Sequence, residues 1–195
     1  MAFVDENAFG ILIGYHSIED DEYGLERERF VERFNEFRSA VFDYVTTLRV
    51  AEKATVLDFG HAVYVEFADG DQREDPLAWG KAARSLLVGR EFQSVVVVTH
   101  GGRWVEEGAP DGPGLPVTGE LAPQLTFARL SHPSEPLRRA LAAEAASRRA
   151  DEDDESGWGP GLYVDDEAVE ALGRQFKNAP TPLEMGGATY FRVGR

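Results

Sequence analysis

The clearest pattern along the chain is an apolar stripe between residues 25 and 49. Phenylalanine, valine and leucine recur there at spacings of three and four residues, and acidic residues fall on another face. This periodicity predicts one long amphipathic helix. Phe34 and Phe37 lie in the stripe, so we expect both rings to belong to the hydrophobic core.

Three further helices are predicted from their start signals. A helix from Pro76 to about Val88 has proline at the position where the missing N–H costs nothing. A helix from about Glu135 to Arg149 follows Ser134, which can cap it. A last helix, about residues 167–177, is capped by Asp165 or Asp166.

Strands are predicted where apolar residues run together or alternate. Residues 55–68 alternate strictly, which indicates one long bent strand or a hairpin turning near Gly60 and His61. Gly101 and Gly102 predict a hairpin turn between strands 94–99 and 103–106. The other predicted strands are Ala8–His16, Gln124–Leu130 and Ala188–Val193.

The order of these segments predicts an α+β fold: a mixed, largely antiparallel sheet packed against about four helices. The first 105 residues have a split β-α-β layout that resembles ferredoxin-like folds. We expect a single domain over residues 1–195, with loop excursions at 109–123 and 151–161, where proline, glycine and charged residues concentrate.

Charge is unevenly distributed. The net charge is −15, and two stretches carry it: residues 5–36 hold 10 acids against 3 bases, and residues 144–170 hold 10 against 2. Such local fields attract cationic partners and repel phosphate backbones. Adaptation to a salt-rich habitat would explain the same acidity without any function.

The acidity favours a cytosolic protein-binding module with a cationic partner, such as an immunity or inhibitor protein against a toxin, or an adaptor or structural subunit of a larger assembly. The chain is then not an enzyme and needs no cofactor. Trp158 either packs in the core or is offered to the partner. The expected partner-binding residues are Asp20, Asp21, Glu22, Asp151, Asp153, Asp154, Glu155 and Trp158.

Three histidines follow predicted strands: His16, His100 and His132. If they converged, they would serve a metal-assisted or acid–base hydrolase, which is the alternative function. We expect them to be scattered, so neither a catalytic residue nor a metal site is assigned. His61, inside an alternating segment, is expected to be packed or hydrogen-bonded.

Other function classes are disfavoured by what the sequence lacks. It has no cysteine, which excludes disulfides and thiolate chemistry, and no P-loop, G-x-G-x-x-G or H-E-x-x-H motif. Its arginines form no aromatic-interleaved basic patch for nucleic acid. No apolar run is long enough to cross a membrane, and the start does not resemble a secretory signal, so we expect a cytoplasmic protein. The oligomeric state is left open.

Overall fold

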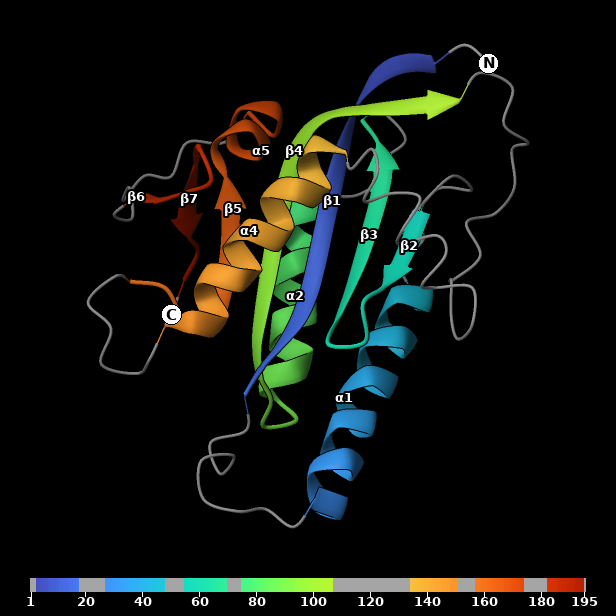
Figure 1. Cartoon of the computed structure of the whole chain (residues 1–195), viewed down its shortest axis with the longest axis vertical. Helices are drawn as coiled ribbons and strands as arrows, with labels where there is room; N and C mark the ends of the chain where they lie inside the picture. Colours follow the sequence, from blue (N-terminus) through green and yellow to red (C-terminus); the bar gives the residue numbers. More distant parts are fainter. Residues whose placement is uncertain are drawn as a thin grey trace.

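The computed structural model describes residues 3–17, 27–47, 55–69, 75–106, 134–150, 157–173 and 182–194. They form seven strands and four helices (Figure 1). In chain order these are β1 (Phe3–Ser17), α1 (Arg27–Thr47), β2 (Thr55–Asp58), β3 (Ala62–Ala68), α2 (Pro76–Val88), β4 (Gln93–Glu106), α4 (Glu135–Arg149), β5 (Gly161–Asp165), α5 (Asp166–Ala171), β6 (Pro182–Met185) and β7 (Ala188–Arg192).

All seven strands belong to one sheet in the order β2-β3-β1-β4-β5-β7-β6. The β4–β5 pair is parallel, and every other pair is antiparallel. The predicted α+β class with a mixed, largely antiparallel sheet is confirmed. The first four strands with α1 and α2 have the ferredoxin-like order β2-β3-β1-β4, which confirms that part of the prediction too.

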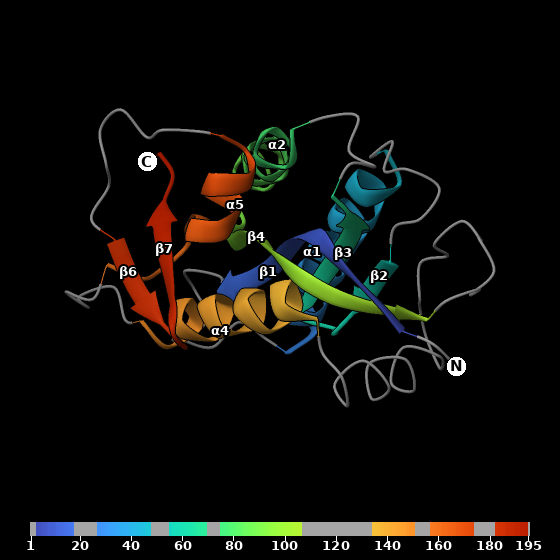
Figure 2. The same cartoon turned by 90° about the horizontal axis from the view of Figure 1, so that it is seen from above.

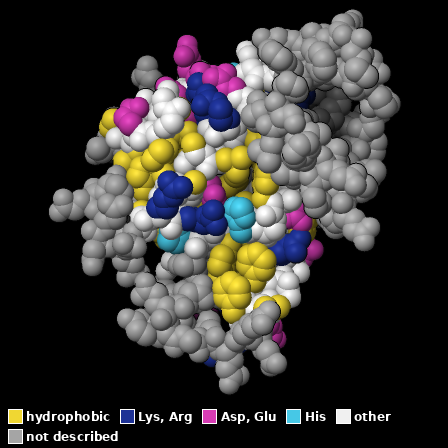
Figure 3. Space-filling view, viewed as in Figure 1, with side chains coloured by type: hydrophobic (Ala, Val, Ile, Leu, Met, Phe, Trp, Pro, Cys, Tyr) yellow, Lys and Arg dark blue, Asp and Glu magenta, His cyan; other side chains and the backbone are white. Residues whose placement is uncertain are grey.

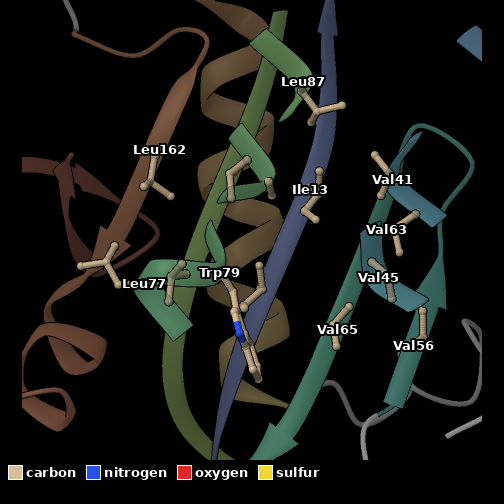
Figure 4. Close-up of a cluster of buried hydrophobic side chains, with 14 of the residues drawn as sticks. Ile13, Val41, Val45, Val56, Val63, Val65, Leu77, Trp79, Leu87 and Leu162 are labelled. Atoms are coloured by element: carbon tan, nitrogen blue, oxygen red, sulfur yellow. The ribbon is translucent and has the colours of Figure 1, made fainter. Parts of the chain in front are cut away.

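Helices cover both faces of the sheet (Figure 2). On one face α1, α2 and α5 enclose a cluster that includes Ile13, Val65, Trp79 and Leu162 (Figure 4). On the other face α4 is the one helix of the described ranges that packs over a second cluster, which includes Leu12, Tyr64 and Tyr163. Alternate residues of β1 face the two clusters, as the two-residue period of a strand requires.

The predicted apolar stripe is confirmed as the buried face of α1, which begins and ends two residues inside the expected limits. Phe37 is buried, and Phe34 is half-buried and packs against the same cluster.

The predicted hairpin at Gly101 and Gly102 is wrong. Strand β4 continues through both glycines to Glu106, because β1 pairs with it over its whole length, from Phe3 opposite Glu106 to Ser17 opposite Gln93. A continuous partner strand satisfies the backbone groups that a turn would have left unpaired. Gly101 instead allows close packing, since a Cβ there would lie 3.2 Å from the Glu135 side chain.

The alternating segment at 55–68 is a hairpin, as one of the two alternatives predicted. Its turn runs over Phe59, Gly60 and His61. Gly60 has a φ of +83°, which favours glycine, and its N–H donates to the Asp58 carboxylate at 2.7 Å. The turn therefore holds His61 at one end of the sheet.

The carboxyl-terminal part differs from expectation in three respects. Strands β5 and β6 were not predicted, since both are short. Helix α5 begins after the Asp165 cap as expected but ends at Ala171. The strand predicted at 124–130 and the excursion at 109–123 lie outside the described residues.

Candidate functional site

Three elements meet at the carboxyl end of β1. His16 is the second-last residue of this strand, and His61 lies in the β2–β3 turn beside it. The Tyr15 N–H donates to the His61 carbonyl at 2.9 Å, which ties the strand to the turn. The last turns of α4 lie against both histidines through Glu144 and Ser147.

The side chains gathered there are named here the His–Glu–Arg cluster, consisting of His16, His61, Glu144 and Arg148. They come from three separate parts of the chain: a strand end, a hairpin turn and a helix end. Only the fold brings them together.

Glu144 is the buried centre of the cluster, with only 2% of its side chain exposed. One carboxylate oxygen, Oε1, lies 2.6 Å from Arg148 Nε and 3.6 Å from His61 Nε2. Neither contact has hydrogen-bond geometry, so Oε1 receives no hydrogen bond from the described residues. Gly14 permits the close approach, since a Cβ there would lie 3.2 Å from Glu144 Cγ.

His16 is fixed by a backbone contact. Its Nε2–H donates to the Ser147 carbonyl of α4 at 2.9 Å. Burial lowers the pKa of His16 below its ordinary 6.5; the Ser147 carbonyl and Glu144 oppose this shift, and Arg148 adds to it. His16 is therefore a neutral hydrogen-bond donor at pH 7, and it anchors the end of β1 to α4.

Arg148 faces outward. Its side chain is 42% exposed, and its Nε lies 2.6 Å from Glu144 Oε1. Apart from Glu144, no described residue forms a hydrogen bond or ion pair with its guanidinium group. Arg149, the next residue of α4, is also exposed, and the His61 side chain is 35% exposed. On the face that α4 covers, basic and histidine side chains lie next to one another with an acidic one between them (Figure 3).

A divalent cation does not fit this cluster. No group of three or more histidine, cysteine, aspartate or glutamate side chains is placed to hold a metal in the described part of the chain. The single carboxylate of the cluster is already neutralised by Arg148. The arrangement suits an anion, because it presents a guanidinium group and an imidazole at the surface.

A second polar cluster lies at the other end of α4, around Arg139. Its guanidinium contacts four carboxylates, those of Glu135, Asp165, Asp166 and Glu167. Asp165 is fully buried; burial raises its pKa to about 7, and this shift is opposed by the N–H groups of Ala168 and His100 and by Arg139. The Glu135 pair lies within α4, whereas the pairs with Asp165, Asp166 and Glu167 join α4 to β5 and α5, so this cluster fixes α4 and α5 against the sheet.

The predicted strand-end histidines do not share one site. His100 lies in the middle of β4, opposite Phe9 of β1, and its Nε2 lies 3.2 Å from the Asp69 carboxylate. His16 is seven residues further along β1 than Phe9, which corresponds to roughly 20 Å. The strand-end position assigned to His100 is wrong, because β4 continues past it. His132 lies outside the described residues.

The expected partner-binding acids also fall outside the described residues: Asp20, Asp21, Glu22, Asp151, Asp153, Asp154 and Glu155. Trp158 is described, and it lies in the core under α4. It is 9% exposed, with its ring centre 5.0 Å from that of Tyr163 and 5.6 Å from that of Tyr190. Of the two positions considered for this side chain, it takes the packed one.

The sequence matches no protein-family model and no curated protein. Solved structures share its fold. The adenylyl cyclase CyaB from P. aeruginosa matches with a TM-score of 0.60 at 12% identity, over 100% of this chain and 97% of that one. The guanylyl cyclase Cya2 matches with a TM-score of 0.55 at 14% identity, over 100% and 95%. The fold is that of nucleotide cyclase domains.

A third solved structure adds a ligand. The guanylate cyclase domain of RhGC from Catenaria anguillulae, solved in complex with GTP, matches with a TM-score of 0.50 at 9% identity, over 98% of this chain and 99% of that one. At these identities the likeness concerns the fold.

The function predicted from charge is wrong. An acidic binding module, whether immunity protein, inhibitor or adaptor, conflicts with a fold whose solved examples are adenylyl and guanylyl cyclases. The hydrolase alternative required the strand-end histidines to converge, and His16 and His100 do not. Net charge describes the field around a protein and not its fold, so it could not have distinguished these classes. The cationic partner stays a prediction that nothing tests.

One signal in the sequence did point to the cluster. Glu144 and Arg148 are four residues apart on a predicted helix, the spacing of an ion pair. Many such pairs lie on solvated surfaces, whereas here the Glu144 side chain is 2% exposed and packs against Gly14 of β1. His61 carried no signal that separated it from a packed histidine.

Among the helices of the described ranges, none has the length and apolar character needed to cross a membrane.

Proposed function

We propose that this chain is a nucleotide-binding domain built on the nucleotide cyclase fold, and that the His–Glu–Arg cluster holds the triphosphate of a nucleoside triphosphate. The observation that carries the proposal is the contact between Glu144 and Arg148. The buried Glu144 carboxylate lies 2.6 Å from Arg148 Nε, and 42% of the Arg148 side chain is exposed.

An arginine held in this way is suited to phosphate. The planar fork of a guanidinium group donates two parallel hydrogen bonds to phosphate oxygens, and an arginine already fixed loses less side-chain freedom on binding. His61, whose Nε2 lies 3.6 Å from the same Glu144 oxygen, adds a hydrogen-bonding group beside it. A chain with a net charge of −15 repels anions in general, so a local group of cations is needed where one binds.

The purine nucleotide class is supported by the solved structures of the same fold, which are named as adenylyl and guanylyl cyclases and include one with GTP. A cytoplasmic location is part of this proposal, because nucleoside triphosphates are available in the cytoplasm.

Isothermal titration calorimetry of the full chain with ATP and GTP tests the proposal, with adenosine and guanosine as matched controls that lack phosphate. At least one triphosphate should bind about tenfold or more tightly than its nucleoside. Equal affinity for triphosphate and nucleoside, or binding of neither, would contradict it.

A further inference from the structure

The charges in the His–Glu–Arg cluster bear on how a triphosphate would be neutralised. Sites that act on nucleoside triphosphates usually hold Mg²⁺ through one or two carboxylates together with the phosphate oxygens. The cluster has one carboxylate, Glu144, and its Oε1 lies 2.6 Å from the Nε of Arg148. A divalent cation at Glu144 would have to displace that arginine or lie beside its positive charge.

A cation of the protein already neutralises Glu144. Arg148 carries a permanent positive charge with its Nε 2.6 Å from Glu144 Oε1, and His61 Nε2 lies 3.6 Å from the same oxygen. In the ranges the structure describes, no other group of carboxylate or histidine side chains is arranged for a metal.

Resting on the proposed function, we infer that this chain binds the nucleoside triphosphate as the metal-free anion and does not cyclise it. The domain is then a nucleotide sensor on an enzyme's fold. Its ligand is the free triphosphate, recognised by the guanidinium group of Arg148, and the ligand leaves unchanged.

The chemistry explains why neutralisation by arginine alone is insufficient for turnover. Cyclisation forms a bond between the 3′ oxygen and the α-phosphorus and breaks the bond from that phosphorus to the pyrophosphate oxygen. The 3′ proton must pass to a base, and pyrophosphate leaves with the additional negative charge. Metal ions normally bridge the phosphate oxygens and stabilise that charge. The cluster provides no position for them.

Two titrations distinguish the alternatives. ATP and GTP are titrated into the full chain in a buffer with excess EDTA, and again in the same buffer with excess MgCl₂. We expect binding in EDTA that is at least as tight as in magnesium, because Mg²⁺ removes charge from the triphosphate. Affinity about tenfold higher with magnesium, which corresponds to 1.4 kcal/mol, would overturn the inference and leave the proposed function standing.

Product analysis completes the test. The chain is incubated with ATP or GTP and either Mg²⁺ or Mn²⁺, and the mixture is separated by chromatography. We expect no cyclic nucleotide and no pyrophosphate, and formation of either would overturn the inference. Absence of binding in both buffers would instead overturn the proposed function and, with it, this inference.

Discussion

The buried carboxylate of Glu144 lies 2.6 Å from the Nε of Arg148, whose side chain is 42% exposed. The contact fixes a partly exposed guanidinium group at the end of α4, and a guanidinium group can donate two parallel hydrogen bonds to a phosphate. This relationship supports the proposed anion site, and it yields the first two predictions.

Arg148→Ala should lower the affinity for ATP or GTP by about tenfold to a hundredfold, because hydrogen bonds to a charged group contribute roughly 1.5–3 kcal/mol each. Calorimetric titration measures the change. Arg138→Ala is the matched control, since Arg138 is an exposed arginine at the opposite end of α4. Its affinity should stay within about twofold of the wild type. Equal losses of affinity in the two variants would mean that nucleotide affinity depends only on the overall charge of the protein.

The contact between Glu144 and Arg148 should also stabilise the folded protein. Removing Arg148 leaves the Glu144 carboxylate buried and unneutralised, so Arg148→Ala should lower the free energy of unfolding by about 1–3 kcal/mol. This is below the range for a fully buried pair because Arg148 is 42% exposed. The double variant Glu144→Gln with Arg148→Ala should recover most of the loss in urea unfolding, since it removes the isolated charge. A double variant no more stable than Arg148→Ala would refute this explanation.

The burial of His16 predicts that the free energy of unfolding depends on pH. Burial lowers its pKa in the folded chain below 6.5, so the unfolded chain takes up a proton first as the pH falls. Protonation then favours the unfolded state, and the free energy of unfolding decreases as the pH drops below about 6.5.

His16→Gln tests this dependence, because the glutamine amide can donate to the Ser147 carbonyl that the imidazole now contacts. Urea unfolding at several pH values on either side of 6.5 should show the wild type losing more stability on acidification than the variant. If the free energies of unfolding of the two proteins changed equally with pH, His16 would not contribute to the pH dependence.

The fold was predictable where local patterns decide it. The stripe of α1 and the proline at the start of α2 specify their helices directly, and the observed limits agree within two residues. The prediction of a turn at Gly101 and Gly102 was wrong because a pair of glycines is compatible with both a hairpin and a continuous strand. The choice depended on β1, which lies some ninety residues earlier in the chain.

The site was predictable only in part, for the same reason. His16 was a candidate because it ends a strand, but its partners on α4 are more than a hundred residues away. Which of the four histidines would lie beside Glu144 depended on strand order and on the side of the sheet that α4 covers. Neither is encoded in a local pattern.

The last prediction concerns the stripe of α1. Phe37 is 1% exposed, and its ring packs edge-on against Tyr15 and Phe92 at centre distances of 5.2 and 5.6 Å. Phe34 also packs edge-on against Tyr15 but is only half-buried. Phe37→Ala should therefore cost about 3–5 kcal/mol of stability, as for other large-to-small core changes. Phe34→Ala should cost about 1–2 kcal/mol, because part of its ring already faces water.

Thermal or urea unfolding of the two variants measures the difference in their stability losses. Equal losses would mean that Phe34 is covered in solution by something other than the described residues, and that the stripe is buried along its whole length.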